Sequence, residues 1–174
     1  MKIFETTRLY VDKFNKSDFE DFYDMQSNPK VMRFIKKHMN REESKTELNR
    51  FIGYYDDPNI FYKIWAVKKQ TNNELIGLCG VYENEKSEFE IAYRLREKFW
   101  RQGFGQEIAN ELINYLFENT DLTELTASVR IGNKGSIKIL ENEMDFIKEI
   151  KHNESSERIY KLRKKTGYNN VYSS

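Results

Sequence analysis

The amino-acid sequence predicts a mixed α+β fold, because the spacing of its apolar residues changes twice along the chain. Around residues 17–26 and 40–55, apolar side chains recur every three or four positions, which is the spacing of a helix face packed on a core. Between residues 61 and 95 the spacing falls to two, with many aromatic and β-branched residues, as in strands. Helical spacing returns after residue 106. This order predicts a central sheet flanked by helices.

The first third is predicted to contain one strand followed by two helices. Residues 8–14 alternate apolar and polar side chains and form the first expected strand. Each helix should begin with a capping box, in which a side chain and the backbone at the helix start exchange hydrogen bonds. The two boxes are Ser17 with Glu20 and Asn40 with Glu43. The sequences "SNPK" and "DDP" should end the two helices.

The rest of the chain supplies most of the expected sheet. The strands "FYKIWAVKK" and "ELIGLCGVY" flank the turn "QTNN", and "EFEIAYRL" follows with Glu90, Ala92 and Arg94 on its more polar face. A helix from Gln106, the strand "LTELTASV", a short helix from Asn133 and the strands "DFIKEI" and "ERIYKL" complete the set. In this chain of 174 residues, residues 1–163 are expected to form a single domain and residues 164–174 a loose polar tail.

The composition argues against several classes of protein. Lys and Arg number 29 against 28 Asp and Glu, so the net charge of +1 gives no broad basic surface for nucleic acid. The longest apolar run, Leu75–Tyr82, is far shorter than the ~20 residues that span a bilayer, so a cytoplasmic protein without membrane contact is expected. His38 and His152 are far apart, and the one cysteine, Cys79, lies in the apolar run. No metal site is therefore expected.

The start of the helix at Gln106 is unusual, because Gly103 and Gly105 flank a phenylalanine after the aromatic and basic run "KFWRQ". The first turn of a helix leaves backbone N–H groups unpaired, and glycines let an anion such as phosphate approach them. Glycines also serve tight turns and close packing, and two of them do not separate these explanations. The loop lacks the Lys-Ser/Thr pair of nucleoside-triphosphatase loops and the third glycine of a dinucleotide fingerprint.

The order of elements and several motifs resemble the GNAT superfamily of acyl-CoA N-acyltransferases. The similarity is greatest to the branch that includes the ribosomal-protein N-terminal acetyltransferases, and it extends from Thr7 to Leu162. It is carried by "TTRLYVDKF", "NPKVMRFI", "IGLCGVY", "FEIAYRLREKFWRQGFGQEIANELINYLF" and "VRIGNKGSIKILENEMDF". The resemblance implies a mostly antiparallel, twisted sheet of about seven strands, splayed between the fourth and fifth strands and flanked by about four helices.

Two positions depart from the pattern of the superfamily. Trp100 stands at the first position of the loop motif, where Gln or Arg is usual. The sequence "EMDF" from Glu143 to Phe146 lacks the glycine that relatives commonly have before the phenylalanine, so this turn is expected to differ. Neither change removes the expected anion site.

The resemblance implies acetyl-CoA as the acyl donor and no metal. Backbone N–H groups from Arg101 to Gly105 would hold its pyrophosphate, and the Arg101 side chain is a candidate for a further phosphate contact. The pantetheine arm would enter between the splayed strands, where backbone groups of Ile91, Ala92 and Tyr93 would polarise the acetyl carbonyl. The other residues of the expected cofactor-binding set lie in the loop and at the two helix starts: Trp100, Gln102, Gly103, Phe104, Gln106, Asn133 and Ser136.

Three side chains are candidates for proton transfer. Glu90 points away from the apolar face of its strand and is the candidate base, acting directly or through water, whereas an exposed glutamate paired with Arg94 or a lysine is the alternative. By resemblance to the Asn-x-x-Ser of relatives, Ser136 would donate to the leaving thiolate, although Asn133 and Ser136 also fit a helix N-cap and its first turn. Tyr93 is a weaker substitute for Ser136.

The implied reaction is direct attack of a primary amine on the thioester. A lysine-like amine with a pKa of about 10.4 needs roughly 4.6 kcal/mol to become neutral at pH 7, whereas an α-amine near 7.7–8 needs only about 1–1.4 kcal/mol. A peptide or amino-acid α-amine is therefore slightly favoured over other small-molecule amines. Residues 28–55 are expected to hold the acceptor. A CoA-binding sensor or interaction module without turnover is the alternative, and a monomer or homodimer is expected.

Overall fold

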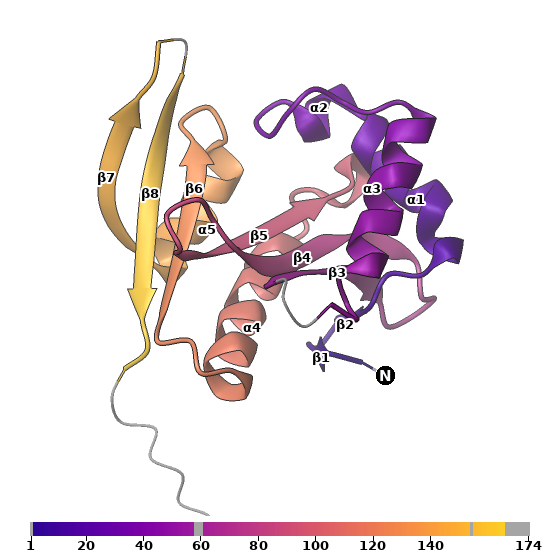
Figure 1. Ribbon diagram of the computed structural model, residues 1–174, viewed down its shortest axis with the longest axis horizontal. Coiled ribbons are helices and arrows are strands. Elements are labelled where there is room, and N and C mark those ends of the chain that lie inside the picture. The colour runs from indigo at the N-terminus through magenta and orange to yellow at the C-terminus, as the bar shows by residue number, and fades with distance from the viewer. Residues whose placement is uncertain (1, 58–60, 154, 166–174) are drawn as a thin grey trace, which may run out of the picture.

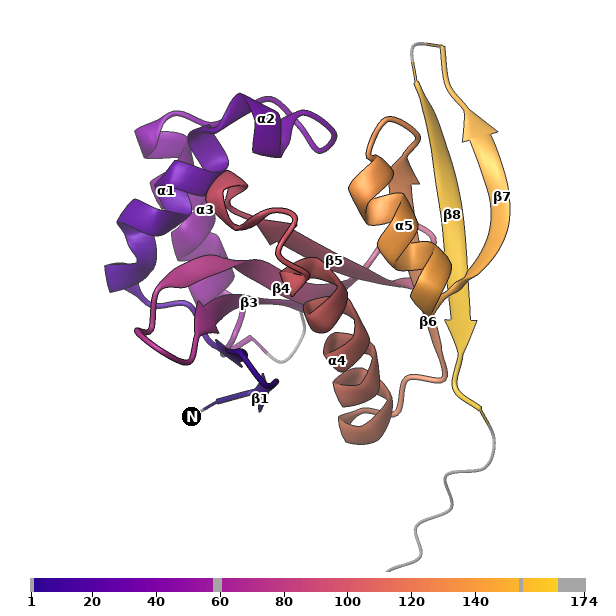
Figure 2. The same ribbon diagram turned by 180° about the vertical axis from the view of Figure 1, so that it is seen from behind.

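The computed structural model describes residues 2–57, 61–153 and 155–165, which form an eight-stranded sheet with helices on both faces (Figures 1 and 2). The strands are β1 (Phe4–Glu5), β2 (Leu9–Asp12), β3 (Tyr62–Lys69), β4 (Leu75–Glu83), β5 (Phe89–Leu95), β6 (Glu124–Arg130), β7 (Asp145–Lys151) and β8 (Ser156–Arg163). The helices are α1 (Phe19–Ser27), α2 (Pro29–Met32), α3 (Arg41–Gly53), α4 (Phe104–Asn119) and α5 (Lys134–Glu143). The predicted mixed α+β class is confirmed, with β1 and α2 as additions.

The sheet has the order β1-β2-β3-β4-β5-β6-β8-β7, and its neighbouring strands are antiparallel except for β5 and β6. These two are parallel and pair at one position, Glu90 with Thr126. Beyond this pair the strands diverge, so the sheet opens between residues 91–95 and 127–130 (Figure 1). Strands β5 and β6 correspond to the fourth and fifth strands predicted from the sequence. The splay between these strands, which the family resemblance implied, is confirmed.

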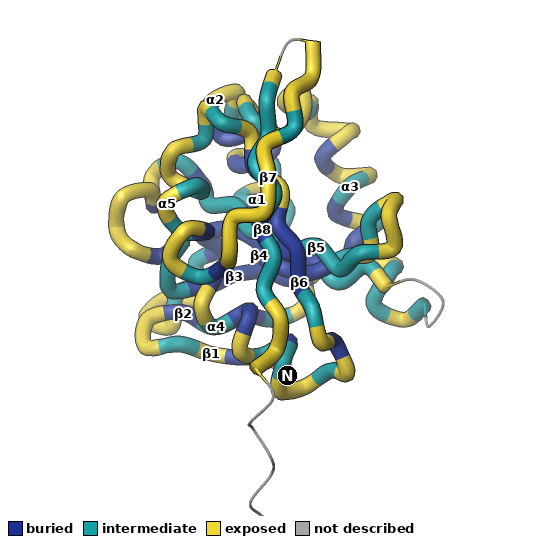
Figure 3. Tube along the Cα trace, turned by 90° about the vertical axis from the view of Figure 1, so that its left-hand side faces the viewer, coloured by how far each residue is buried: buried dark blue, intermediate teal, exposed yellow. Residues whose placement is uncertain are grey.

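Two apolar clusters, one on each face of the sheet, hold the layers together. Helices α4 and α5 contribute to one cluster, and α1 and α3 contribute to the other. Strand β3 serves both, because Trp65 and Val67 belong to the first cluster while Ile64 and Ala66 belong to the second, as alternation along a strand requires. Burial is concentrated in the central strands, whereas β7 at the edge is exposed along most of its length (Figure 3).

The start of the first helix differs from the prediction. A 3-10 turn, Lys16–Asp18, leads into α1, and the capping box stands at the start of this turn. Asn15 and Asp18 form it in place of Ser17 and Glu20: the Asn15 side chain accepts from the Ser17 N–H, and Asp18 accepts from the Asn15 N–H. Asp18 is also buried against strand β3, where Lys68 Nζ lies 2.6 Å from its carboxylate. This distant pairing selects the cap, and local spacing cannot reveal it. The second predicted box, at the start of α3, is confirmed.

Several smaller predictions concern positions that now have a structural context. Met144, at the turn without glycine, caps α5 with φ −139°, which is extended backbone open to any residue. Cys79 is fully buried, and burial raises the pKa of its thiol.

The described residues contain no group of three or more side chains arranged to hold a metal, and none of their helices is both long and apolar enough to cross a membrane. From residue 166 the predicted tail lies outside the described residues.

Candidate functional site

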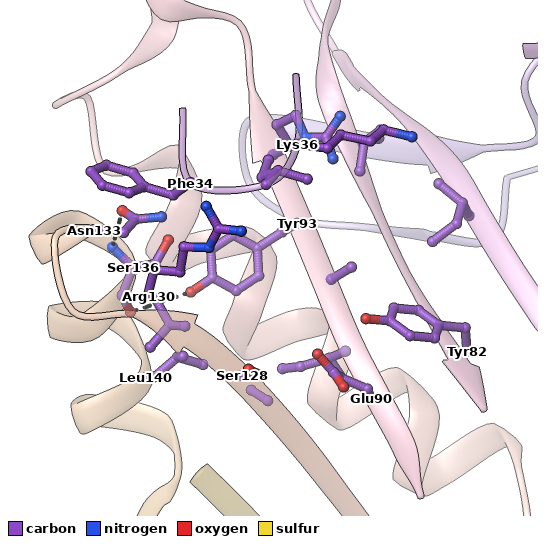
Figure 4. A pocket seen from close by; sticks show the side chains of 18 of the residues that line it. Phe34, Lys36, Tyr82, Glu90, Tyr93, Ser128, Arg130, Asn133, Ser136 and Leu140 are labelled. Carbon is purple, nitrogen blue, oxygen red and sulfur yellow. Dashed lines mark hydrogen bonds between the residues drawn. The ribbon is translucent and has the colours of Figure 1, made fainter. Parts of the chain in front are cut away.

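A cavity of about 440 Å³ occupies the opening between β5 and β6. One wall comes from β3, β4, β5, α3 and the loop after α2, and the other comes from β6, α5 and Glu157 of β8 (Figure 4). Phe34, in the loop after α2, packs on the glycine that follows β6, because a Cβ atom on Gly132 would lie 2.6 Å from its ring. The cavity is therefore enclosed by segments far apart in the sequence.

The loop before α4 has the backbone arrangement of an anion-binding site. Gly103 precedes the helix in the left-handed region, with φ 81° and ψ −3°, and no side chain caps the first turn. By helix geometry the N–H groups of Phe104, Gly105 and Gln106 have no acceptor within the helix. Together with the positive end of the helix dipole, these groups suit a phosphate.

The two glycines of this loop meet different requirements. The positive φ of Gly103 is a conformation that side chains with a Cβ rarely adopt. Gly105 has a packing role, because a Cβ atom there would lie 2.8 Å from Ile139 Cδ1 of α5. The loop path is constrained further by Arg101, which has φ 60° without being glycine. The turn and packing explanations that the sequence left open thus apply beside the anion site.

Arg8 was not among the site residues predicted from the sequence, and it holds this loop in place. Its Nη1 donates to the carbonyl oxygen of Gln102 at 2.9 Å, its Nε donates to Glu107 at 2.7 Å, and its guanidinium lies 4.2 Å from the centre of the Phe104 ring. Burial raises the pKa of Glu107, but hydrogen bonds from Thr6 and Arg8 outweigh it and hold that pKa below its usual range. The motif "TTRL", which contains Arg8, was the feature of the sequence that could have identified this residue.

Most side chains predicted to bind the cofactor are used within the protein. Trp100 Nε1 donates to the last carbonyl oxygen of β5 at 2.9 Å, and Gln102 donates to a backbone oxygen of the preceding turn at 2.9 Å. Gln106 hydrogen-bonds to side chains of α5, and Phe104 is buried in the core. The side chain of Arg101 is exposed. The loop therefore offers mainly its backbone to a ligand.

Glu90 lines the cavity at the point where β5 and β6 separate. Its carboxylate accepts from Asn84 Nδ2 at 3.2 Å, and Tyr82 stands opposite it on β4. Burial, with a smaller contribution from the Glu90 carboxylate, raises the pKa of Tyr82. The alternative pairing with Arg94 does not occur, because Arg94 donates to Gln26 and to a methionine instead. Glu90 is thus half-buried and faces the cavity (Figure 4).

Tyr93, Asn133 and Ser136 meet on the far side of the opening. The Tyr93 hydroxyl donates to the backbone oxygen of Ser136 at 3.4 Å, and Asn133 caps α5 by accepting from the Ser136 N–H at 3.2 Å (Figure 4). Burial raises the pKa of Tyr93, so the phenol stays protonated at neutral pH. Two other expected contacts, Ile91 and Ala92, also line the cavity, and the Ile91 side chain is buried in the core.

The predicted acceptor segment supplies charged side chains to the other end of the cavity. Glu47 of α3 accepts from Lys36 Nζ at 3.1 Å and from Arg50 Nη2 at 2.7 Å, and its side chain is 12% exposed. The aromatic rings of Tyr62 and Tyr82 line the cavity beside them. Residues 28–55 therefore contribute a compact group of ion pairs to the cavity, formed by Lys36, Glu47 and Arg50. No local pattern in the sequence indicated this group.

Comparisons with known proteins identify the family of this chain. Residues 8–143 match the model of the acetyltransferase (GNAT) domain, so the chain belongs to the GNAT acetyltransferase family and is an acyl-CoA-dependent acetyltransferase. It is similar to the uncharacterized N-acetyltransferase YoaA of Bacillus subtilis (strain 168), with 27% identity over 151 residues that cover 84% of each chain.

Solved structures share the fold. The GNAT-family acetyltransferase from Bacillus anthracis matches with a TM-score of 0.81 and 22% identity over 94% of this chain and 98% of that chain. The ribosomal L7/L12 α-N-protein acetyltransferase RimL, solved in complex with coenzyme A, matches with a TM-score of 0.79 and 17% identity over 94% of this chain and 98% of that chain. The resemblance inferred from the motifs is confirmed.

Proposed function

We propose that the protein transfers an acetyl group from acetyl-CoA to a primary amine, which attacks the thioester directly. The observation that carries the proposal is the opening between β5 and β6, with candidate proton-transfer groups on both walls and the uncapped start of α4 nearby. The cavity fits a thioester arm, because β5 lacks a strand partner on this side beyond Glu90 within the described residues. RimL, which shares the fold, was solved with coenzyme A.

The reaction requires two proton movements. As the N–C bond forms and the C–S bond breaks, the amine loses a proton and the leaving thiolate gains one. Glu90 accepts the first proton, directly or through water, because its carboxylate lines the cavity without an ion-pair partner among the described residues. Ser136 or Tyr93 supplies the second proton or a hydrogen bond, because both residues line the cavity and the Tyr93 hydroxyl lies against the Ser136 backbone oxygen.

The acceptor is proposed to be an α-amine of a peptide, protein or amino acid before other small-molecule amines. An α-amine is easier to deprotonate near neutral pH than a lysine side chain, by about 3 kcal/mol. RimL, by its description, is an α-N-protein acetyltransferase. The ion-pair group of α3 and the preceding loop forms the acceptor end of the cavity.

Release of free CoA thiol tests this function. Acetyl-CoA is incubated with peptides, amino acids, polyamines and aminoglycosides, and amine-dependent thiol release is expected with at least one class. Absence of release with all classes, combined with tight CoA binding, would support the non-catalytic CoA-binding module instead. Millimolar CoA should also raise the melting temperature, because a ligand at 100 times its Kd stabilises by about 2.7 kcal/mol. ATP and NAD should do markedly less, and equal shifts would leave only a general anion site.

A further inference from the structure

Arg94 brings a positive charge to the cavity without an acidic partner. It lines the cavity from β5, and its Nη1 donates to Gln26 Oε1 and to Met32 Sδ, the latter at 3.2 Å. Both acceptors are uncharged. Its Nε atom is buried and has no hydrogen-bond partner, and among the described residues no carboxylate forms an ion pair with it. The cation is thus held in place but not neutralised.

The position of Arg94 makes this lack of an anion energetically costly. Burial disfavours the charged guanidinium and lowers the pKa of Arg94 to about 10, so the side chain is still charged at neutral pH. Arg94 as a residue is half-buried because it borders the cavity, yet charges that are withdrawn from water are normally paired. A permanent cation without an acidic partner at a ligand cavity is the arrangement expected where the anion belongs to the ligand.

The acids that face the same cavity do not supply this anion. Glu47 favours the charged form of Arg94 electrostatically, but its carboxylate is already bound by Lys36 and Arg50. Glu90 lies on the same strand four residues earlier, which corresponds to about 13 Å at about 3.3 Å per residue. Glu157 of β8 accepts a hydrogen bond from Ser128 and lies 3.2 Å from the His152 ring. Among the described residues that line the cavity, the cations Lys36, Arg50, Arg94 and Arg130 therefore outnumber the carboxylates Glu47, Glu90 and Glu157.

We infer that the acceptor carries a carboxylate, which Arg94 binds while the amine lies near Glu90. This inference rests on the proposed function and specifies its substrate class. Ala92, on the same strand face between the two charged residues, carries only a methyl group and leaves space along the cavity. An extended chain advances about 3.3–3.6 Å per residue, so the span suits a peptide with an acidic residue shortly after its N-terminus better than an amino acid with its own carboxylate.

Charge-matched acceptors test the inference and separate its two sources. The peptide arm compares C-terminally amidated tetrapeptides that carry Glu or Gln at position two or three. The amino-acid arm compares L-alanine with L-alaninamide, both of which carry an α-amine. With saturating acetyl-CoA, the carboxylate member of at least one pair should have a kcat/KM at least tenfold higher than its neutral partner, which is about 1.4 kcal/mol. The arm that shows the preference identifies the source.

Substitutions then assign the preference to Arg94. Arg94→Met should abolish it, and Arg94→Lys should retain part of it, because lysine keeps the charge but not the forked donor geometry. Arg163→Met serves as the matched control, since Arg163 is an exposed arginine paired with Glu124 far from the cavity, and it should preserve the preference. CoA titration of each variant checks that the fold and cofactor site are intact.

A binding measurement keeps this inference separate from the proposed function. Calorimetric titration of each acceptor pair into the CoA-loaded protein should show tighter binding of the carboxylate member. If wild-type protein neither binds nor acetylates the carboxylate members better than their neutral partners, the inference is wrong even when other amines are acetylated. A binding preference that persists in Arg94→Met also overturns it. Failure of thiol release with every amine contradicts the proposed function, and the titration still decides the carboxylate site.

Discussion

The proposed cofactor end and the proposed acceptor end of the site are built from different parts of the chain. At the cofactor end, the loop before α4 offers backbone N–H groups, while most of its side chains bond to neighbouring segments. At the acceptor end, the charged side chains Lys36, Glu47, Arg50 and Arg94 converge from α3, β5 and the loop after α2. The first end depends on the path of one short segment, and the second depends on how three segments pack.

This difference explains which end of the site can be inferred from membership of the GNAT family and which cannot. A backbone site survives extensive change of side chains, and the chain keeps the fold of RimL at 17% identity. An acceptor site made of dispersed side chains changes with each substitution and is specific to the individual protein. Variants at the two ends should therefore separate effects on CoA affinity from effects on the acceptor and the chemical step.

The largest effect is expected from Glu90→Gln, on the wall between the two ends. A general base typically contributes about 10²–10⁴-fold, so turnover with saturating substrates should fall by about that factor, most strongly at low pH, where less amine is already neutral. The measurement is kcat between pH 6 and 9. Glu85→Gln, at an exposed position in the turn before β5, should leave kcat unchanged. A loss of less than tenfold would mean that Glu90 positions the acceptor and does not take its proton.

Ser136→Ala and Tyr93→Phe should identify the group that serves the leaving thiolate. The variant that removes this group should lower kcat by about 10–100-fold, because one proton-transfer or hydrogen-bonding partner is lost, while acetyl-CoA affinity changes little. The two hydroxyl-bearing residues are in contact, so the double variant should lose less than the product of the single losses. Full activity in both single variants across pH 6–9 would remove the pair from the mechanism.

Gly103→Val should act on the cofactor end alone. A β-branched side chain at φ 81° strains the loop and obstructs the backbone that faces the phosphates, so CoA affinity should fall at least tenfold, about 1.4 kcal/mol. Gly105→Ala should be milder, because its Cβ would meet only the movable end of Ile139. Gly53→Val is the control, since a Cβ atom there meets nothing within 4 Å.

Calorimetric CoA titration beside the ligand-free thermal melt measures these glycine variants. The ligand-free protein should remain folded in each of them. Normal CoA binding by Gly103→Val would show that the glycine serves the turn and that the loop is not the phosphate site.

The smallest effect is expected from Arg8→Met, which touches the cofactor end indirectly. Loss of the bonds from Arg8 to Gln102 and Glu107 should loosen the loop and weaken CoA binding about three- to tenfold, with kcat at saturating acetyl-CoA unchanged. Kd for CoA and kcat are measured in parallel. An unchanged Kd would show that the loop keeps its path without the arginine.

Local patterns in the sequence were enough to predict the parts of this protein that depend on neighbours along the chain. Apolar periods of two and three to four residues placed most strands and helices, and the capping signals at Asn40 and Asn133 marked real helix starts. The loop with Gly103 was equally readable, because the start of a helix exposes its N–H groups whatever packs around it. The splay of the sheet came from the resemblance to a family, since no local pattern encodes it.

Contacts between groups that are distant in the sequence followed from the packing of the folded chain. Asp18 caps the first turn and binds Lys68 of β3, Gly105 makes room for Ile139, and Phe34 closes over Gly132. Arg94 was a plausible partner for Glu90 from their shared strand face, yet it bonds to Gln26 and lacks an acid. Each outcome depends on the packing of segments separated by dozens of residues. Short-range spacing does not predict which side chains become neighbours in the fold. It also does not predict which charged side chain stays available to pair with a ligand.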